Sequence, residues 1–83
     1  MNRAEVGNIK KQFGNTVREI RLNKRLTVRK LSHQCDLDNS KLSKIENGKI
    51  NISLSTLVEL ARGLQVNPSE LLKGEFDAAI IPQ

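Results

Sequence analysis

Apolar side chains recur at spacings of three and four residues along most of this chain, which is the period of an amphipathic α-helix. Near the start, one such stripe consists of Ile9, Phe13, Val17 and Ile20. It predicts a helix that ends near Asn23. Strict alternation with a period of two, which is typical of a half-buried strand, is not sustained anywhere. The pattern therefore predicts an all-α protein.

Capping residues divide the middle of the chain into two short helices. Thr27 is a favourable N-cap for a helix over residues 28–34, and Asp38 is one for a helix over Asn39–Glu46. Asn47 and Gly48 are typical of a helix C-terminus and end the second of these helices. Two short helices joined by a tight turn indicate a helix-turn-helix.

Two further helices are predicted in the second half of the chain. A fourth helix over residues 54–63 follows from an inward stripe made of Leu54, Leu57, Leu60, Ala61 and Leu64. Asn67, Pro68 and Glu70 then occupy the N-cap, N1 and N3 positions of a capping box. They predict a one-turn helix that runs through Leu72 and is closed by Gly74. The sequence thus predicts five helices joined by short loops.

The third predicted helix has an unusual outward face. At ~100° per residue, Leu42 and Ile45 point one way. The opposite side carries Asn39, Ser40, Ser43 and Lys44. These are compact hydrogen-bonding groups with one cation and no acid, which suits an approach to DNA phosphates and base edges. A plain polar surface is the alternative interpretation.

Composition and charge favour a polyanionic partner. The chain has 83 residues, enough for one small domain, and its 14 Lys and Arg against 9 Asp and Glu give a net charge of +5. The excess is uneven, with nine basic and two acidic residues in positions 1–35 against five basic and seven acidic in positions 36–83. A basic segment of this kind is a typical electrostatic footprint of nucleic-acid binding. The absence of Trp and Tyr argues against recognition of bases by stacking.

Other classes of function find little support in the residues. The single cysteine, Cys35, excludes an internal disulfide and a multi-cysteine zinc site, and we expect it to be a small buried hydrophobe, with redox sensing as the less favoured alternative. No nucleophile–base pair or glycine-rich phosphate loop is visible, so neither an enzyme nor a cofactor is expected. No apolar run reaches the ~18–20 residues of a membrane span, and no secretory signal is visible. We therefore expect a cytoplasmic protein with no membrane partner.

Motifs spread from Phe13 to Leu72 together resemble the Cro/CI-like helix-turn-helix family, also called the XRE family. The motifs are Phe13-Gly14, Val17-Arg18 and Arg21, then Leu26-Thr27 and Leu31, then Ser43-Lys44-Ile45-Glu46-Asn47-Gly48-Lys49, and finally Leu57, Leu60-Ala61, Leu64 and Val66-Asn67-Pro68-Ser69-Glu70-Leu71-Leu72. The resemblance implies a compact five-helix bundle of the lambda-repressor-like type. Its helix-turn-helix would lie at helices two and three, with the third helix in the DNA major groove.

The resemblance also implies a set of site residues. The base-reading positions of the family match Asn39, Ser40 and Lys44, with Ser43 and Asp38 at the margin. The phosphate-binding positions match Thr27, Val28, Asn47, Lys49 and Asn51, and Arg21 is a further candidate. In this family an arginine of helix one pairs with the glutamate that ends the recognition helix, which implies an ion pair between Arg21 and Glu46.

Two departures from the family pattern matter for the structure. Asp36 stands where the family usually has a turn glycine, a position at which a left-handed backbone would be strained for any residue with a Cβ. Ile52 stands where the family usually has a proline. Ile50 and Ile52 flank Asn51 in a loop, where they would either plug the core or meet a second subunit.

The function predicted is sequence-specific binding of double-stranded DNA by a homodimeric transcriptional regulator. One helix-turn-helix reads few base pairs, so a two-fold dimer on a palindromic or pseudo-palindromic operator is expected. Residues 1–74 would form the DNA-binding domain, and residues 75–83 an apolar tail that contacts a second subunit or another partner. The dimer surface is predicted to include Leu64, Val66, Leu71, Leu72, Phe76 and Ile80.

Three alternatives stay open at this point. The chain could be an antitoxin that binds DNA and a toxin, the latter through its tail. It could be a protein-interaction module that keeps only the shape of a helix-turn-helix. A regulator of a restriction–modification system or of a phage switch would differ from the prediction only in genomic context.

Overall fold

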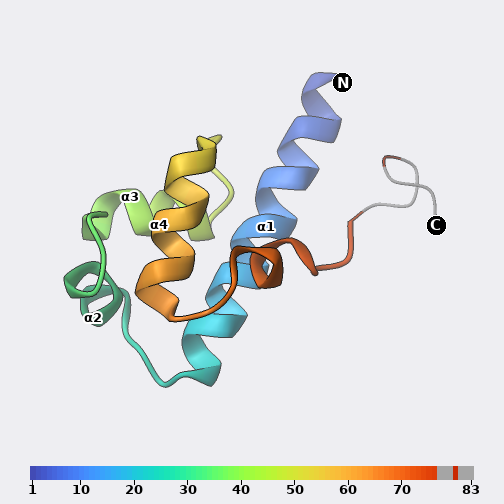
Figure 1. Cartoon of the computed structure of the whole chain (residues 1–83). Helices are drawn as coiled ribbons and strands as arrows, with labels where there is room; N and C mark the ends of the chain where they lie inside the picture. Colours follow the sequence, from blue (N-terminus) through green and yellow to red (C-terminus); the bar gives the residue numbers. More distant parts are fainter. Residues whose placement is uncertain (77–79, 81–83) are drawn as a thin grey trace.

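The computed structural model describes residues 1–76 and residue 80, which form four α-helices followed by a short 3-10 helix (Figure 1). The elements are α1 (Arg3–Asn23), α2 (Val28–His33), α3 (Asn39–Glu46), α4 (Leu54–Leu64) and the 3-10 helix η1 (Pro68–Leu72). Because the described part contains no strand, the all-α prediction is confirmed. The fifth element is a 3-10 helix, so the predicted count of five is not reached by α-helices.

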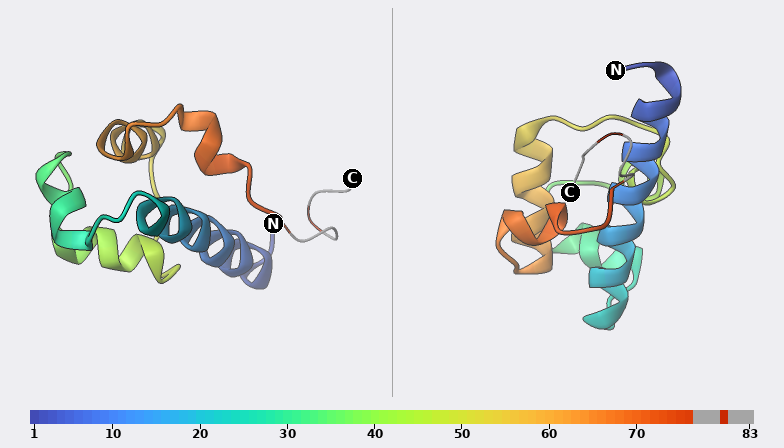
Figure 2. Two further views of the ribbon diagram at one scale, coloured as in Figure 1. Left: turned by 90° about the horizontal axis from the view of Figure 1, so that it is seen from below. Right: turned by 90° about the vertical axis from the view of Figure 1, so that its right-hand side faces the viewer.

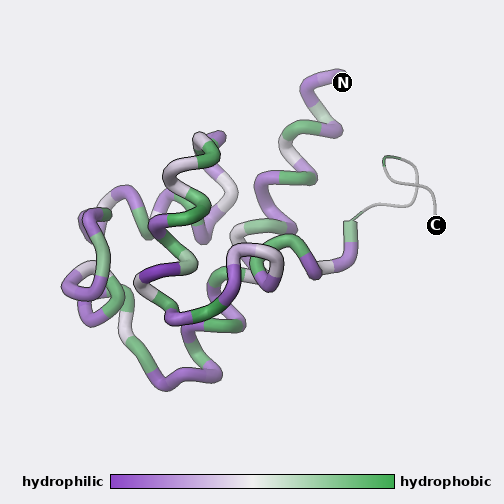
Figure 3. The backbone as a smooth tube through the Cα atoms, in the orientation of Figure 1, coloured by the Kyte–Doolittle hydropathy of each residue, from purple (hydrophilic) through white to green (hydrophobic). Residues whose placement is uncertain are grey.

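The helices form two layers around a small core. Seen from below, α4 and η1 lie on one side of the molecule and α1 and α3 on the other, with α2 at one end (Figure 2, left). Bands of hydrophilic and hydrophobic residues alternate along α1 and α4, as expected of amphipathic helices (Figure 3). The buried core consists of Phe13, Val17, Leu31, Leu37, Leu42, Ile45, Leu57, Leu60, Ala61, Leu64 and Leu71.

The beginnings of the helices are set by side-chain caps. Thr27 Oγ1 accepts a hydrogen bond from the Lys30 N–H at 3.0 Å, and Asp38 Oδ1 accepts one from the Lys41 N–H at 2.7 Å. Both predicted N-caps of the helix-turn-helix are therefore confirmed. The chain also has a capping box that begins α1, in which Asn2 and Glu5 exchange hydrogen bonds.

Three residues in the left-handed region end the helices. Gly48 follows α3 with φ +68°, while Arg25 and Gln65 follow α1 and α4 with φ 58° and 59°. The glycine adopts this conformation at no steric cost, whereas the two longer residues pay for their Cβ atoms. In the described chain these two are the only non-glycine residues with positive φ, so Asp36 has an ordinary backbone and the strain considered above does not arise.

Two local predictions were wrong. Leu54, assigned to the inward stripe of α4, is 76% exposed because it is the first residue of the helix and lies at the rim of an open cleft. The capping box at the start of η1 is incomplete. Asn67 accepts the N–H of Ser69, but the Glu70 carboxylate binds Lys73 Nζ at 2.8 Å instead of returning to the N-cap. The tighter 3-10 turn accounts for this difference.

Gly14 is the point at which α1 and α3 come into direct backbone contact. A Cβ added to Gly14 would lie against the carbonyl oxygen of Ile45 and 2.6 Å from that of Glu46. These carbonyls belong to the last turn of α3. Only a residue without a side chain lets the two backbones approach this closely.

We expect the Gly14→Ala variant to unfold more easily by about 1–3 kcal/mol, because the added methyl must displace backbone rather than a flexible side chain. Gly7 lies in the same helix, and a Cβ added there would meet nothing within 4 Å, so it is the matched control. Gly7→Ala should stabilise the protein by about 0.5–1 kcal/mol, since alanine is the better helix former. Urea denaturation measures both values. Equal effects of the two substitutions would contradict the close contact at Gly14.

Candidate nucleic-acid interface

The outward face of α3 carries polar side chains that are open to solvent. Asn39, Ser40, Ser43 and Lys44 are all exposed, while Leu42 and Ile45 on the opposite side are buried. The only acid in the helix is Glu46, which is 3% exposed and lies inside an ion pair. The exposed surface of α3 therefore has two lysines, Lys41 and Lys44, and no carboxylate.

The predicted phosphate-binding residues lie at the two ends of the helix-turn-helix. Thr27 is exposed at the N-cap of α2, and Val28 begins that helix with its side chain packed partly against the core. Val28 therefore has only its backbone N–H to offer. Asn47, Lys49 and Asn51 are exposed in the segment after α3. Asp38, also exposed, has one carboxylate oxygen engaged in capping α3.

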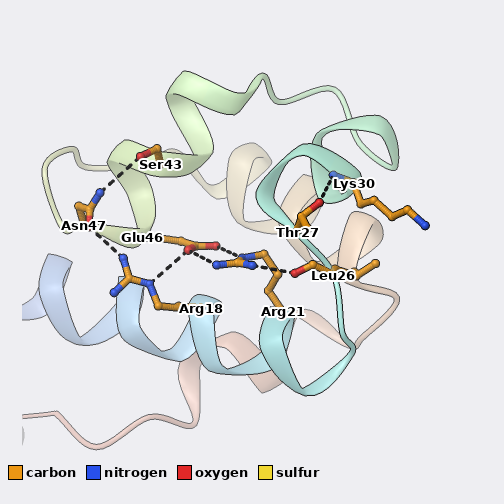
Figure 4. A network of polar contacts seen from close by, with 8 residues as sticks. All are labelled: Arg18, Arg21, Leu26, Thr27, Lys30, Ser43, Glu46 and Asn47. Atoms are coloured by element: carbon orange, nitrogen blue, oxygen red, sulfur yellow. Dashed lines mark hydrogen bonds and ion pairs between the residues drawn. The ribbon is translucent and has the colours of Figure 1, made fainter.

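Arg21 and Glu46 form a bidentate ion pair that joins α1 to the end of α3 (Figure 4). Arg21 Nε lies 2.7 Å from Glu46 Oε2, and Arg21 Nη2 lies 3.0 Å from Glu46 Oε1. Arg21 Nη1 donates to the carbonyl oxygen of Leu26 at 2.7 Å, in the link between α1 and α2. Each nitrogen of the Arg21 guanidinium is thus bound within the chain, and the residue is only 9% exposed. Its placement supports a positioning role and not the phosphate contact considered above.

Arg18 is a residue of this network that the sequence reasoning missed. Its Nε lies 3.3 Å from Glu46 Oε1, and its Nη2 donates to Asn47 Oδ1 at 2.9 Å (Figure 4). Asn47 Nδ2 in turn lies 3.4 Å from Ser43 Oγ. The available signal was the three-residue spacing between Arg18 and Arg21, which places both on neighbouring turns of one helix face.

The residues predicted for the dimer surface fall into two groups. Leu64 and Leu71 are both 0% exposed, so they belong to the core of the single chain and have no surface to offer a second one. This corrects their assignment, since the apolar stripe could not distinguish core from interface. Leu72 is 53% exposed, and Val66, Phe76 and Ile80 are half-buried. The rest of the predicted tail contact, residues 77–79 and 81–83, lies outside the described residues.

An apolar cleft lies between α1, the α3–α4 segment and η1. It has a volume of about 300 Å³. Leu54 and Leu72 are its exposed rim, and Ile50 and Ile52 line it while packing partly against the core. The two loop isoleucines thus contribute to both arrangements that the sequence left open, a plug for the core and an open apolar surface.

Cys35 is half-buried behind α2, where its thiol donates to the Leu31 carbonyl at 3.3 Å. Burial raises the pKa of the Cys35 thiol, and the carboxylates of Glu59 and Asp36 add to the increase. The thiol therefore stays protonated at neutral pH, which disfavours a redox-sensing role. Within residues 1–76 and residue 80, no three His, Cys, Asp or Glu side chains come together as a metal site. None of the helices described is long and apolar enough to cross a membrane.

Comparison with known proteins places the chain in a family. A family model described as Helix-turn-helix matches residues 17–71, more than half of the chain. The chain belongs to the XRE-type helix-turn-helix family of DNA-binding transcription regulators, which confirms the resemblance seen in the sequence. The members of this family are regulators, not enzymes.

Its relatives include several controller proteins. The chain is 41% identical over 66 residues to the control protein C.BamHI of Bacillus amyloliquefaciens, an alignment that covers 78% of this chain and 82% of that protein. It is 40% identical over 67 residues to the control protein C.MunI of a Mycoplasma species, covering 80% and 90%.

The fold is shared with solved controller structures. The restriction-modification controller protein C.AhdI of Aeromonas hydrophila is similar with a TM-score of 0.74 and 35% identity, over 76% of this chain and 96% of that one. C.Esp1396I, solved as a tetramer in complex with its natural 35-base-pair operator, is similar with a TM-score of 0.69 and 26% identity, over 78% and 96%.

Loss of the carboxylate at the α1–α3 junction should be costly. In the Glu46→Gln variant, the guanidinium of Arg21 would remain buried without a counter-charge, and we expect the free energy of unfolding to fall by about 3–5 kcal/mol. Glu70→Gln is the control, because Glu70 pairs with Lys73 on the surface and should change stability by at most about 0.5 kcal/mol. Thermal and urea unfolding measure both variants. A cost below about 1 kcal/mol for Glu46→Gln would contradict a structural role for the pair.

Proposed function

We propose that this protein binds double-stranded operator DNA in a sequence-specific way, as a dimeric transcriptional regulator whose α3 enters the major groove. The observation that carries the proposal is the exposed, acid-free face of α3, which is held by a buried ion pair at its C-terminal end. A face of short polar groups lets the helix approach base edges closely. Membership of the XRE-type family supplies the docking mode.

Base reading rests on the side chains in the middle of that face. Lys44 is suited to donate to the O6 and N7 atoms of a guanine, and Asn39 to pair with the N6 and N7 atoms of an adenine. Ser40 and Ser43 bind either type of base edge, and Asp38 lies at the margin with its carboxylate partly used as a cap. Each good base contact contributes about 1–3 kcal/mol of discrimination.

Phosphate contacts would flank the base-reading face. The free N–H groups at the start of α2, with the hydroxyl of Thr27 and the backbone of Val28, would bind one phosphate. Asn47, Lys49 and Asn51 would bind another on the far side of α3. Such contacts fix the register of the protein on the duplex and carry no sequence information themselves.

The regulated genes are inferred from the relatives. C.BamHI, C.MunI, C.AhdI and C.Esp1396I are all control or controller proteins, two of them named as restriction-modification controllers. We infer that this chain controls a restriction–modification system in the same way, by binding an operator as a symmetric assembly. The antitoxin alternative rests on the tail, most of which lies outside the described residues.

The dimer would form through the apolar cleft. Large exposed side chains around an apolar cleft are typical of a protein–protein interface. Leu54 and Leu72 are 76% and 53% exposed at its rim, and Val58, on the next turn of α4, is 48% exposed. Val66, Phe76 and Ile80, half-buried here, complete the set of surface residues proposed for this contact. A second copy of the chain is the natural occupant, because palindromic operators require two-fold pairs of reading helices.

Substitution of two lysines tests the division between base reading and phosphate binding. With Lys44→Ala, we expect the preference for the operator over a random duplex to fall by about 1–3 kcal/mol, since a base contact is lost. With Lys49→Ala, affinity should fall equally for both duplexes, since a phosphate contact is lost. Fluorescence anisotropy measures all four affinities. If neither variant differs from the wild type, the site assignment is wrong.

A charge placed at the rim of the apolar cleft tests the dimer. Leu72→Glu should convert the dimer into a monomer, because a buried carboxylate without a partner is costly. Leu22→Glu is the matched control, since Leu22 is similarly exposed, at 56%, but is not among the residues that line the cleft. Sedimentation equilibrium measures the mass of each variant. Retention of the dimer by Leu72→Glu would exclude this surface.

A further inference from the structure

A second, polar cleft lies between α1 and the end of α3, beside the base-reading face. It has a volume of about 230 Å³ and is lined by Lys11, Asn15, Arg18, Glu46 and Asn47. Three of these residues, Lys11, Asn15 and Arg18, follow one another on α1 at spacings of four and three, so they share one face of that helix. Lys11, Asn15 and Asn47 are exposed, and the side chain of Arg18 is 41% exposed.

The two walls of this cleft are held in fixed positions. Gly48, directly after α3, packs on the backbone of Lys11, where an added Cβ would lie 2.8 Å from Lys11 Cα and 2.9 Å from its backbone nitrogen. Arg18 donates from the other wall to Asn47 Oδ1 at 2.9 Å. The cleft is therefore part of the same junction that positions α3, and its shape does not depend on a mobile loop.

The charge of the cleft suits an anion. Lys11 and Arg18 contribute two cations, and the amides of Asn15 and Asn47 add neutral donors. Glu46 is the only acid among the lining residues, and both of its oxygens accept from arginines, at 2.7 and 3.0 Å from Arg21 and at 3.3 Å from Arg18. With that carboxylate neutralised, the cleft keeps a net positive charge. Its volume is several times the ~30 Å³ of one water molecule, which leaves room for a phosphate group.

The cleft continues the exposed face of α3. Asn47 lies one turn beyond Ser43 and touches it, with Asn47 Nδ2 at 3.4 Å from Ser43 Oγ. On its other side Asn47 is bound to Arg18 (Figure 4). A duplex seated on α3 would therefore pass from the base-reading face across Asn47 toward the cleft on α1.

From this arrangement we infer that the DNA-binding surface extends onto α1, where Lys11, Asn15 and Arg18 form with Asn47 a binding site for a backbone phosphate of the duplex. The inference rests on the proposed function, since it assigns α1 a part in the same DNA contact. Arg18 serves the site in two ways, because it supplies positive charge and fixes the orientation of the Asn47 amide. Lys11 takes part in no ion pair with another described residue, so its ammonium is available to an incoming phosphate.

Neighbouring lysines offer a matched test. Lys10 and Lys11 have the same charge, but Lys10 lines the apolar cleft and Lys11 the polar one. The variants Lys10→Gln, Lys11→Gln and Lys11→Arg keep most of the side-chain stem, so packing against Gly48 is preserved. Their affinity for a fluorescein-labelled duplex of random sequence is measured by anisotropy between about 50 and 200 mM salt, because backbone contacts alone govern such binding.

The loss of one phosphate contact lowers the slope of log K against log salt by about 0.9, so Lys11→Gln should lose about 3.5-fold less affinity over this range than the wild type. Lys10→Gln and Lys11→Arg should keep the slope of the wild type. Equal slopes for Lys10→Gln and Lys11→Gln, whether reduced or unchanged, would overturn the site while leaving the proposed function intact. A wild-type protein without salt-dependent binding to the duplex would overturn both. Thermal unfolding of each variant checks that the fold is retained.

Discussion

The position of α3 depends on one junction, where the buried guanidinium of Arg21 meets the carboxylate of Glu46. Burial of two charges has a large desolvation cost, and a pair of this kind repays it only with good geometry and additional hydrogen bonds. Here both carboxylate oxygens accept from arginines, and Arg21 also binds the Leu26 carbonyl. One side chain thereby ties together α1, the α1–α2 link and the last turn of α3. Gly14 completes the junction by allowing the backbones of α1 and α3 to touch.

This junction explains how a thin core can hold a reading helix rigidly. Only Leu42 and Ile45 anchor the apolar side of α3 in the core, and the helix has eight residues. Polar contacts with directional geometry fix its rotation, which hydrophobic contact alone would leave less defined. Because Glu46 is buried in the pair, the junction also removes the only acid of α3 from the surface that faces DNA. The same two arginines thus serve structure and electrostatics.

Local rules predicted most of the helices because their signals lie close together in the chain. Thr27 and Asp38 each cap a helix by binding an N–H three residues ahead, so the sequence alone identified both. The errors concern contacts over longer distances. An apolar stripe indicates that a residue faces inward on its helix, yet it does not say whether another element covers that position. Leu54 is therefore exposed, and Leu64 and Leu71 are core residues where a dimer surface was predicted.

The polar part of the site shows the same division. The face of α3 followed from helical geometry, whereas the link between Arg18 and Asn47 joins residues 29 positions apart and had no local signal. The polar cleft on α1 depends on how α1 crosses α3, which only the fold reveals. The net charge of +5 first indicated a polyanionic partner in general. In the structure, part of its excess in residues 1–35 lies beside α3, and part is used up within the chain by Arg21.

The central claim is that a rigidly held α3 reads DNA sequence in two-fold pairs, and selection of bound duplexes from a random-sequence pool tests it most directly. We predict that the recovered sequences share one short motif that occurs twice, related by two-fold symmetry, with centres about 34–36 Å apart, or one turn of DNA. Recovery of duplexes with no shared motif, at an affinity set by salt alone, would contradict the account.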